Sequence, residues 1–308
     1  MIYFVTVNYY SSNLIAELVN SIAKGGCDGV KGNGDRKFNH IIKSNDRPTL
    51  ITNIDYQIII INNSPDDDAI HHLKSDNILI IEAGSNLGFG QACNLGLNWI
   101  YKQDPQAIVW IINPDTCVLP TALEKAAAFF KEYPKLSIVG TIIYTLSGEI
   151  WFAGGEFLTE IGEIKTNVSI KNTELPYLKT DWVSGCSLLI NFTNFASCPQ
   201  FNPDYFLYYE DFDFCQRYQK EGHLITITHQ IGVVHEPSAI TGKNMAAKFK
   251  HSTYSYLLTI ETYTSKHILI FRFTRLLFNA IYLIPIKPKV AFGKLHGIWL
   301  YLRRGIKN

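Results

Sequence analysis

The sequence lacks several patterns that assign a protein to a familiar class. Its six cysteines include no C-x-x-C pair and no regular spacing, which disfavours a disulfide framework or a zinc site and predicts mostly core thiols in a reducing compartment. The N-terminus is apolar but has no basic region or small-residue cleavage site, so we expect a first strand and not a signal peptide. The uncharged run Leu276–Ile286 is short of the ~18–20 residues needed to cross a bilayer. These absences favour a cytoplasmic protein.

Acidic residues are missing from the end of the chain. No Asp or Glu follows Glu261, whereas nine of the 28 Lys and Arg residues do, so the net charge of +1 conceals a charge of −8 over residues 1–261. An acidic body disfavours nucleic-acid binding, because phosphate neutralisation needs a basic face on the folded domain. The basic end, with the apolar stretch Ile268–Ile286, predicts an amphipathic helix lying on an anionic membrane surface. The alternative is a core helix whose arginines extend to solvent.

Apolar runs alternate with helical patterns over the first half of the chain. We expect strands at 2–8, 56–62, 78–83 and 107–113, and helices at about 12–23, 90–102 and 121–132. Strands that are apolar on both faces and separated by helices predict an α/β fold with a mostly parallel, doubly wound sheet. Ligands bind such sheets at the carboxyl ends of the strands.

The second half changes character and ends in helices. Strand-rich sequence begins at Leu136, with a strand expected at 182–191, a helix near 211–221 and a strand at 224–234. Residues 241–308 predict helices, and the polar, glycine-rich stretch 24–53 predicts a surface insertion.

Three groups of polar residues stand where chemistry is expected. Asp115 emerges just past a buried strand, and a hard divalent cation that bridges phosphates needs only one or two such carboxylates; a turn-forming Asp is the alternative role. Glu210, Asp211 and Asp213 open a helix among aromatic residues; capping alone explains the acids, but aromatic neighbours would also raise the basicity of one carboxylate. His235 follows an apolar run and is a candidate metal or diphosphate contact, although a lone His is more often structural.

Taken in order, these segments resemble glycosyltransferase family 2, especially its bacterial rhamnosyltransferase-like branch. The resemblance covers about residues 1–240 and is carried by seven pieces: Val5-Thr6-Val7-Asn8-Tyr9, Asn62-Asn63-Ser64, Asn86-Leu87-Gly88-Phe89-Gly90 with Asn94 and Gly96, Asn113-Pro114-Asp115-Thr116, Val183-Ser184-Gly185-Cys186, Tyr209-Glu210-Asp211-Phe212-Asp213 with Arg217, and His235.

The resemblance implies a GT-A fold and an inverting single displacement. It assigns residues 1–135 to a nucleotide-sugar-binding half and 136–240 to an acceptor and catalytic half. Asp115, with His235 as a further contact, would hold Mg²⁺ or Mn²⁺ on the diphosphate, and Asp211 would be the general base, with Glu210 as the competing candidate. The implied donor site comprises Val7, Asn8, Tyr9, Asn62, Asn86, Gly88, Asn94 and Asn113.

Two departures from the family pattern bear on the donor. Many members have an Asp after the second strand that contacts the nucleobase, but here Asn62 stands there and no acid follows until Asp66. Asn113 replaces a frequent acid in the metal motif, a feature that rhamnosyltransferase-like members share and that favours dTDP-rhamnose. The expected acceptor is a surface polysaccharide or lipid-linked glycan at the inner face of the membrane.

Two other functions remain open at this point. A sugar-1-phosphate nucleotidyltransferase would need a basic, glycine-rich loop near the first strand, and residues 7–12 are neither basic nor glycine-rich. A catalytically silent glycan- or nucleotide-binding subunit would be favoured by loss of the acids at 115 and 211, and both are present.

Overall fold

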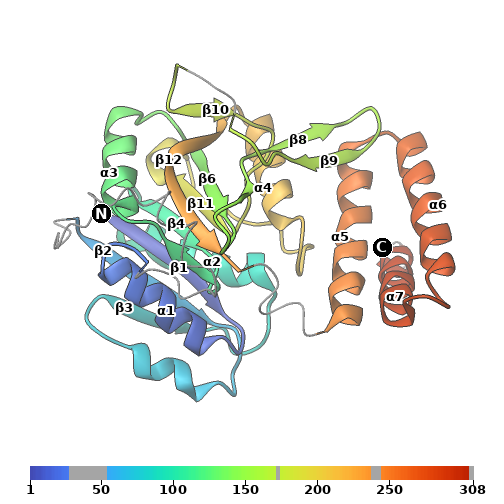
Figure 1. The fold of residues 1–308 in the computed structure, drawn as a ribbon, viewed down its shortest axis with the longest axis horizontal. Coiled ribbons are helices and arrows are strands. Elements are labelled where there is room, and N and C mark those ends of the chain that lie inside the picture. The colour runs from blue at the N-terminus through green and yellow to red at the C-terminus, as the bar shows by residue number, and fades with distance from the viewer. Residues whose placement is uncertain (28–53, 171–173, 237–243, 305–308) are drawn as a thin grey trace.

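The computed structural model describes residues 1–27, 54–170, 174–236 and 244–304 (Figure 1). Most of the insertion expected at 24–53 therefore lies outside the described residues. The first half contains β1 (Ile2–Asn8), α1 (Ser12–Ala23), β2 (Tyr56–Asn62), the 3-10 helix η2 (Asp68–Leu73), β3 (Ile78–Glu82), α2 (Phe89–Gln103), β4 (Ile108–Ile112), β5 (Thr116–Val118) and α3 (Ala122–Glu132).

The second half adds further strands and four α-helices. It contains β6 (Ile138–Tyr144), β7 (Ile150–Phe152), β8 (Gly155–Leu158), β9 (Glu163–Thr166), β10 (Tyr177–Lys179), β11 (Ser187–Asn191), the 3-10 helix η3 (Phe192–Asn194), α4 (Glu210–Lys220), β12 (Ile225–His235), α5 (Met245–Tyr263), α6 (Lys266–Tyr282) and α7 (Pro288–Arg304). The strand expected at 182–191 begins only at Ser187, because residues 183–186 form a loop that bonds to the start of α4.

One large sheet organises the α/β body. Its ten strands follow the order β10-β12-β6-β11-β4-β1-β2-β3, with β5 on β12 and β7 on β6. The neighbours β3, β2, β1 and β4 are parallel, and so are β6 and β12, whereas β11 runs antiparallel between β4 and β6. β1 is buried along its whole length, as a strand covered on both faces must be. The predicted α/β fold with a parallel sheet core is confirmed.

The C-terminal helices form a layer beside the α/β body (Figure 1). α5 and α7 approach at backbone distance, because a Cβ added to Gly293 or Gly297 would lie 2.5 Å from the carbonyl oxygen of Ala246 or Lys250. The apolar stretch expected as one helix over 268–286 ends at Tyr282, and Pro288 begins α7, in keeping with the preference of proline for the first turn. Among the described residues, no helix is both long and apolar enough to span a bilayer.

The cysteines differ in part from the expectation of free thiols. Cys93, Cys186 and Cys215 are buried thiols and Cys198 is half-buried. Cys27 and Cys117, 90 residues apart, form a disulfide. The backbone N–H of Cys27 donates to the carbonyl of Val118 in β5, which sets the two cysteines side by side. Sequence spacing gave no sign of this pair because the contact depends on where β5 lies in the fold.

Candidate active site

Asp115 and His235 meet because two strands pair. Asp115 stands between β4 and β5, and the antiparallel pairing of β12 with β5 sets His235 opposite Thr116. His235 Nε2 lies 3.1 Å from Asp115 Oδ1, and both side chains are less than 8% exposed, at 7% and 6%. Asp115 Oδ1 has no hydrogen-bond partner, and neither does His235 Nδ1, although both atoms are buried. A carboxylate oxygen and an imidazole therefore converge with lone pairs free for a cation.

This pair is a small ligand set. Within the described ranges, no cluster of three or more His, Cys, Asp or Glu side chains could hold a metal ion. A divalent cation at Asp115 and His235 would therefore complete its coordination with water and with oxygens of a bound molecule, as Mg²⁺ does in phosphate sites. The donor types and the unpartnered carboxylate oxygen fit such an ion.

Asp211 is held at the start of α4 by a constrained backbone. Tyr208 and Tyr209, immediately before the helix, both have left-handed backbone angles, with φ of 70° and 64°. Such angles are unfavourable for aromatic residues and are found mainly where the surroundings enforce them, often at functional sites. The N–H groups of Gly185 and Phe212 donate to the two carboxylate oxygens of Asp211, at 2.9 and 2.8 Å. Burial raises the pKa of Asp211, and these hydrogen bonds partly oppose the rise.

Glu210, the competing base candidate, is placed differently. Glu210 is 6% exposed. It packs on α2, because a Cβ added to Gly90 would lie 3.4 Å from the Cβ of Glu210. Its Oε2 is buried without a hydrogen-bond partner. Burial, and then the charge of Asp211, raise the pKa of Glu210 well above its usual range. Asp211 accepts two backbone hydrogen bonds, whereas Glu210 Oε2 accepts none, so the surroundings stabilise the ionised form of Asp211 more than that of Glu210.

The loop 183–186 joins Asp211 to the segment that carries Asp115. The N–H of Asn113 donates to the carbonyl of Cys186 at 3.0 Å, and the N–H of Gly185 reaches Asp211. Burial raises the pKa of the Cys186 thiol, and the charges of Asp115 and then Asp211 raise it further. A glycine at 185 lets the loop approach its neighbours closely, because a Cβ there would lie 3.1 Å from the Phe89 ring and 3.4 Å from the Cβ of Asp211.

The expected donor residues at the ends of β1 and β2 are buried and bonded to acids. Asn8 Nδ2 donates to Asn62 Oδ1 and to Asp67 Oδ2, both at 3.0 Å. Asn62 Nδ2 donates to Glu82 Oε2 at 2.9 Å. The amides of Asn8 and Asn62 are 0% and 1% exposed, so Asp67 and Glu82 supply the more accessible polar groups at this edge. Sequence reasoning missed both acids; the run Asp66-Asp67-Asp68 after β2 was the available signal.

Other expected donor residues have clear local roles. Asn86 Oδ1 accepts from Asn63 Nδ2 and from the N–H of Gly88, both at 3.0 Å, and its side chain lies in an exposed loop. Asn94 bonds both backbone groups of Phe201, at 2.9 and 2.7 Å, and so anchors the segment before α4. Gly88 has φ of 80°, and a Cβ there would lie 2.0 Å from the Phe206 carbonyl oxygen. These bonds fasten the start of α2 to the segment that leads to Asp211.

The remaining implied donor residues lie along the same strand edge. Val7 is buried within β1, and Tyr9, directly after it, is 43% exposed. Of the aromatic residues near the acids, Trp151 is 36% exposed and its ring centroid lies 5.0 Å from that of His235. An exposed indole beside His235 is suited to stack on a sugar ring.

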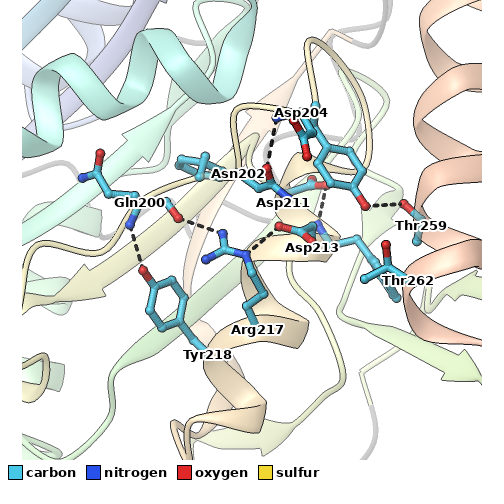
Figure 2. A network of polar contacts seen from close by, with 12 residues as sticks. Gln200, Asn202, Asp204, Asp211, Asp213, Arg217, Tyr218, Thr259 and Thr262 are labelled. Atoms are coloured by element: carbon cyan, nitrogen blue, oxygen red, sulfur yellow. Dashed lines mark hydrogen bonds and ion pairs between the residues drawn. The ribbon is translucent and has the colours of Figure 1, made fainter. Parts of the chain in front are cut away.

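Asp213 links α4 to the C-terminal helices (Figure 2). Its carboxylate is 1% exposed, accepts from Arg217 Nε at 2.7 Å and accepts from the Tyr263 hydroxyl on α5 at 2.7 Å. Figure 2 shows Thr259 on the neighbouring helix, and its hydroxyl donates to the Tyr205 hydroxyl at 3.2 Å. Arg217 also donates to the carbonyl of Gln200 at 2.7 Å. A buried, fully paired carboxylate of this kind supports the fold and the neighbouring Asp211.

Removing the Tyr263 hydroxyl should weaken this link. Tyr263→Phe keeps the ring but deletes one donor to a buried carboxylate, so we expect a loss of about 1.5–3 kcal/mol in the free energy of unfolding, measured by urea denaturation. Tyr133→Phe is the matched control, because its hydroxyl donates to the exposed Glu132 at a similar 2.7 Å. Equal losses in the two variants would contradict a structural role for the Asp213–Tyr263 bond.

Comparison with known proteins agrees with this geometry. Residues 38–187 match the model of the glycosyl transferase family 2. The chain is 24% identical over 205 residues to the N-acetylglucosaminyl-diphospho-decaprenol L-rhamnosyltransferase of Mycobacterium tuberculosis, covering 59% of this chain and 67% of that protein. It is 23% identical over 261 residues to the low-salt glycan biosynthesis hexosyltransferase Agl10 of Haloferax volcanii, covering 79% and 82%.

Solved structures show the same fold. A crystal structure of GalNAc-T7 with UDP, GalNAc and Mn²⁺ superposes with a TM-score of 0.54 at 12% identity, over 85% of this chain and 47% of that one, so the chain spans about half of GalNAc-T7. Residues 1–349 of S. aureus TarS superpose with a TM-score of 0.50 at 12% identity, over 99% and 91% of the chains. The family model and the two relatives support a rhamnosyltransferase-like protein of the glycosyl transferase family 2 type. The solved structures show that the fold is GT-A.

Proposed function

We propose that this glycosyltransferase moves a sugar from a nucleotide diphosphate to a glycan acceptor by an inverting single displacement. The observation that supports this most is that one short loop, 183–186, bonds on both sides. The Cys186 carbonyl accepts from the N–H of Asn113, two residues before Asp115, and the N–H of Gly185 donates to Asp211. A base and a candidate diphosphate site are thereby set on one edge of the sheet. Residues 1–135 would bind the donor, residues 136–240 would bind the acceptor, and residues 241–308 would form the basic helical region.

Asp211 would serve as the base of the displacement. Its carboxylate, held by the N–H groups of Gly185 and Phe212, takes the proton of the attacking hydroxyl. The oxygen of that hydroxyl bonds to the anomeric carbon from the side opposite the nucleotide diphosphate, and the bond to the diphosphate breaks. A base pKa raised toward the working pH favours this proton transfer. Glu210, which is buried, would keep the start of α4 packed on α2.

Asp115 and His235 would hold Mg²⁺ or Mn²⁺. The support is the unpartnered buried Asp115 Oδ1 next to the imidazole of His235. When bound, such an ion offsets negative charge on the leaving diphosphate. The chain's own contribution is to fix both ligands through the pairing of β5 with β12 and to keep them less than one-tenth exposed.

Asp67 would contact the nucleobase in place of the acid that the sequence lacks directly after β2. Burial raises the pKa of Asp67, but the hydrogen bonds from Asn8 and then Ser12 outweigh it and lower the pKa. The carboxylate is therefore ionised and oriented, and it can accept from the ring N–H that uracil and thymine share.

Asp67→Asn should raise the KM for the nucleotide sugar. The amide offers one acceptor instead of two oxygens, and we expect KM to rise about tenfold, with kcat changed far less, because this contact is made equally in the ground and transition states. Steady-state kinetics with a saturating acceptor measures both constants. Asp66→Asn, an exposed neighbour, is the control, and an equal rise in its KM would contradict the assignment.

The relatives support a proposal for the sugar and the acceptor. Because the Mycobacterium tuberculosis relative is described as a rhamnosyltransferase acting on a decaprenol-linked sugar, we propose dTDP-rhamnose as the donor and a lipid-linked or surface glycan as the acceptor. The enzyme would then work in the cytoplasm, at the inner face of the membrane.

A panel of nucleotide sugars tests the proposal. Release of nucleotide diphosphate is followed with and without Mn²⁺ or Mg²⁺, and NMR reads the anomeric configuration of the product. Turnover of one donor with an inverted product supports the transferase. Binding of donors without turnover, even with membrane lipid extract added, favours a catalytically silent subunit, and formation of a nucleotide sugar from a sugar 1-phosphate and a nucleoside triphosphate favours a nucleotidyltransferase.

A further inference from the structure

The outer faces of α6 and α7 carry a dense set of uncovered apolar side chains. Ten of the twenty large hydrophobic residues that are exposed in the described chain lie between Ile270 and Leu302. Phe278 and Tyr282 are 67% and 69% exposed, and Phe292 is 60% exposed. The full set is Ile270, Phe271, Phe278, Ile281, Tyr282, Ile284, Ile286, Phe292, Trp299 and Leu302. An apolar surface this concentrated marks a binding face.

The two helices present the same arrangement of residues. On α6, Phe271, Arg275, Phe278 and Tyr282 follow the spacing i, i+4, i+7, i+11, which places them on one side of a helix. On α7, Phe292, His296, Trp299 and Arg303 repeat that spacing. The guanidinium of Arg303 lies 5.0 Å from the Trp299 ring centroid. Each stripe therefore combines aromatic and basic side chains.

These stripes are not needed to hold the three helices together. The inward side of α6 supplies Leu269, Phe273, Leu276 and Leu277 to a cluster with Leu257, Ile298 and Tyr301. Gly293 and Gly297 bring α7 against the backbone of α5. Because the inner faces are already packed, the outer aromatic residues are available to another partner.

The charge of this region identifies the partner. Residues 262–308 contain nine Lys and Arg and no Asp or Glu. Arg272 and Arg304 are bonded within the protein, to the Ile161 carbonyl and to Glu261. Arg275, Lys287, Lys289 and Arg303 are exposed on or between the stripes. A second copy of the chain would bring basic residues against basic residues, whereas an anionic bilayer complements both the charge and the aromatic side chains.

We propose that the outer faces of α6 and α7, with the connection 283–287, form a docking face for an anionic lipid bilayer. The aromatic side chains enter the headgroup region, and Arg275, Lys287, Lys289 and Arg303 contact the lipid phosphates. This inference rests on the proposed function, which places the acceptor at a membrane, and it names the surface that meets that membrane.

Helix α5 joins the docking face to the segment around Asp211. Figure 1 shows α5 between the α/β body and α6. On its other side, α5 bonds the segment around Asp211: the Ser255 hydroxyl donates to the Leu207 carbonyl at 2.9 Å, and the Tyr263 hydroxyl donates to Asp213. The Phe206 ring also stacks on His251 with centroids 4.6 Å apart. Docking would therefore hold Asp211 at a fixed height above the bilayer.

Vesicle cosedimentation of the full chain tests the docking face. The wild type should bind vesicles of phosphatidylcholine mixed with phosphatidylglycerol, bind phosphatidylcholine alone weakly, and lose affinity as salt is added. Lys287→Glu/Lys289→Glu should lower the partition coefficient by on the order of tenfold to a hundredfold. Phe278→Ser/Phe292→Ser/Trp299→Ser should lower it at least about tenfold, because three apolar anchors are removed.

Matched variants elsewhere on the surface serve as controls. Lys102→Glu/Lys131→Glu makes the same charge change on exposed residues of α2 and α3, and Val168→Ser alters a side chain that is 60% exposed. Both should bind vesicles like the wild type. If the control variants lose as much vesicle binding as the face variants, then net charge and general hydrophobicity determine the binding, not this face, and the proposal is overturned. It is also overturned if the wild type ignores anionic vesicles and sediments as a dimer that the triple variant dissolves.

The same samples separate this inference from the proposed function. Slow hydrolysis of a nucleotide sugar in solution requires neither vesicles nor the outer stripes, so the face variants should hydrolyse the donor at the wild-type rate. Vesicle binding without hydrolysis of any donor would leave the docking face standing and remove the proposed function. Hydrolysis of a donor without vesicle binding would leave the proposed function standing and remove the docking face.

Discussion

Asp211→Asn is expected to lower kcat by about 10²–10⁴-fold, the usual contribution of a general base. The amide keeps an acceptor oxygen for only one of the two backbone N–H groups of Gly185 and Phe212. Asp211 is not among the implied donor-binding residues, so the KM for the donor should stay nearly unchanged. Release of nucleotide diphosphate under saturating donor measures kcat, and thermal unfolding checks that the variant is folded.

The pH dependence of the wild-type rate belongs to the same prediction. Burial raises the pKa of Asp211, partly opposed by its backbone hydrogen bonds. A base must be ionised to accept a proton, so kcat should fall as the pH drops through this raised pKa, above the ~3.9 of an ordinary Asp. The residual kcat of Asp211→Asn should not show this fall at low pH.

Glu210→Gln is the control that distinguishes the two carboxyls. Glu210 is 6% exposed, and burial followed by the charge of Asp211 raises its pKa well above the usual range. A carboxyl that stays neutral cannot accept a proton, so its amide should keep kcat within about tenfold of the wild type. The assignment of roles would be reversed if Glu210→Gln lost the activity and Asp211→Asn retained it.

Asp115→Ala is expected to reduce kcat by about 10²–10³-fold and to remove its dependence on added Mn²⁺ or Mg²⁺. The substitution deletes the carboxylate oxygen that is buried without a hydrogen-bond partner beside His235. His235→Ala should act in the same direction and less strongly, because it leaves the anionic carboxylate of Asp115, the type of ligand that a hard divalent cation prefers.

Binding of Mn²⁺ gives this second prediction a readout that does not depend on turnover. Calorimetric titration of Mn²⁺ in the presence of a nucleoside diphosphate should show binding to the wild type and weakened binding to both variants. Asp66→Ala removes an exposed acid near the same edge of the sheet and should titrate like the wild type. Undiminished Mn²⁺ binding by Asp115→Ala would place any metal elsewhere.

The sequence alone determined the order of strands and helices and the edge of the sheet at which the acids lie. Hydrophobic periodicity is local, so β1, β2, β3 and β4 were expected within one residue of their observed ends. Parallel strands end at the same edge, which is why Asp115 could be assigned to a ligand-binding edge before any contact was known. The resemblance to family 2 supplied the candidate roles.

Tertiary structure alone decided which side chains meet. His235 reaches Asp115 because β12 pairs with β5 across more than a hundred residues, and Tyr263 reaches Asp213 because α5 packs beside α4. Asp67 bonds to Asn8 across 59 residues. Strand register and helix packing set these contacts, and neither is encoded in local periodicity. The sequence could therefore name the candidate groups, while the fold selected their partners and their burial.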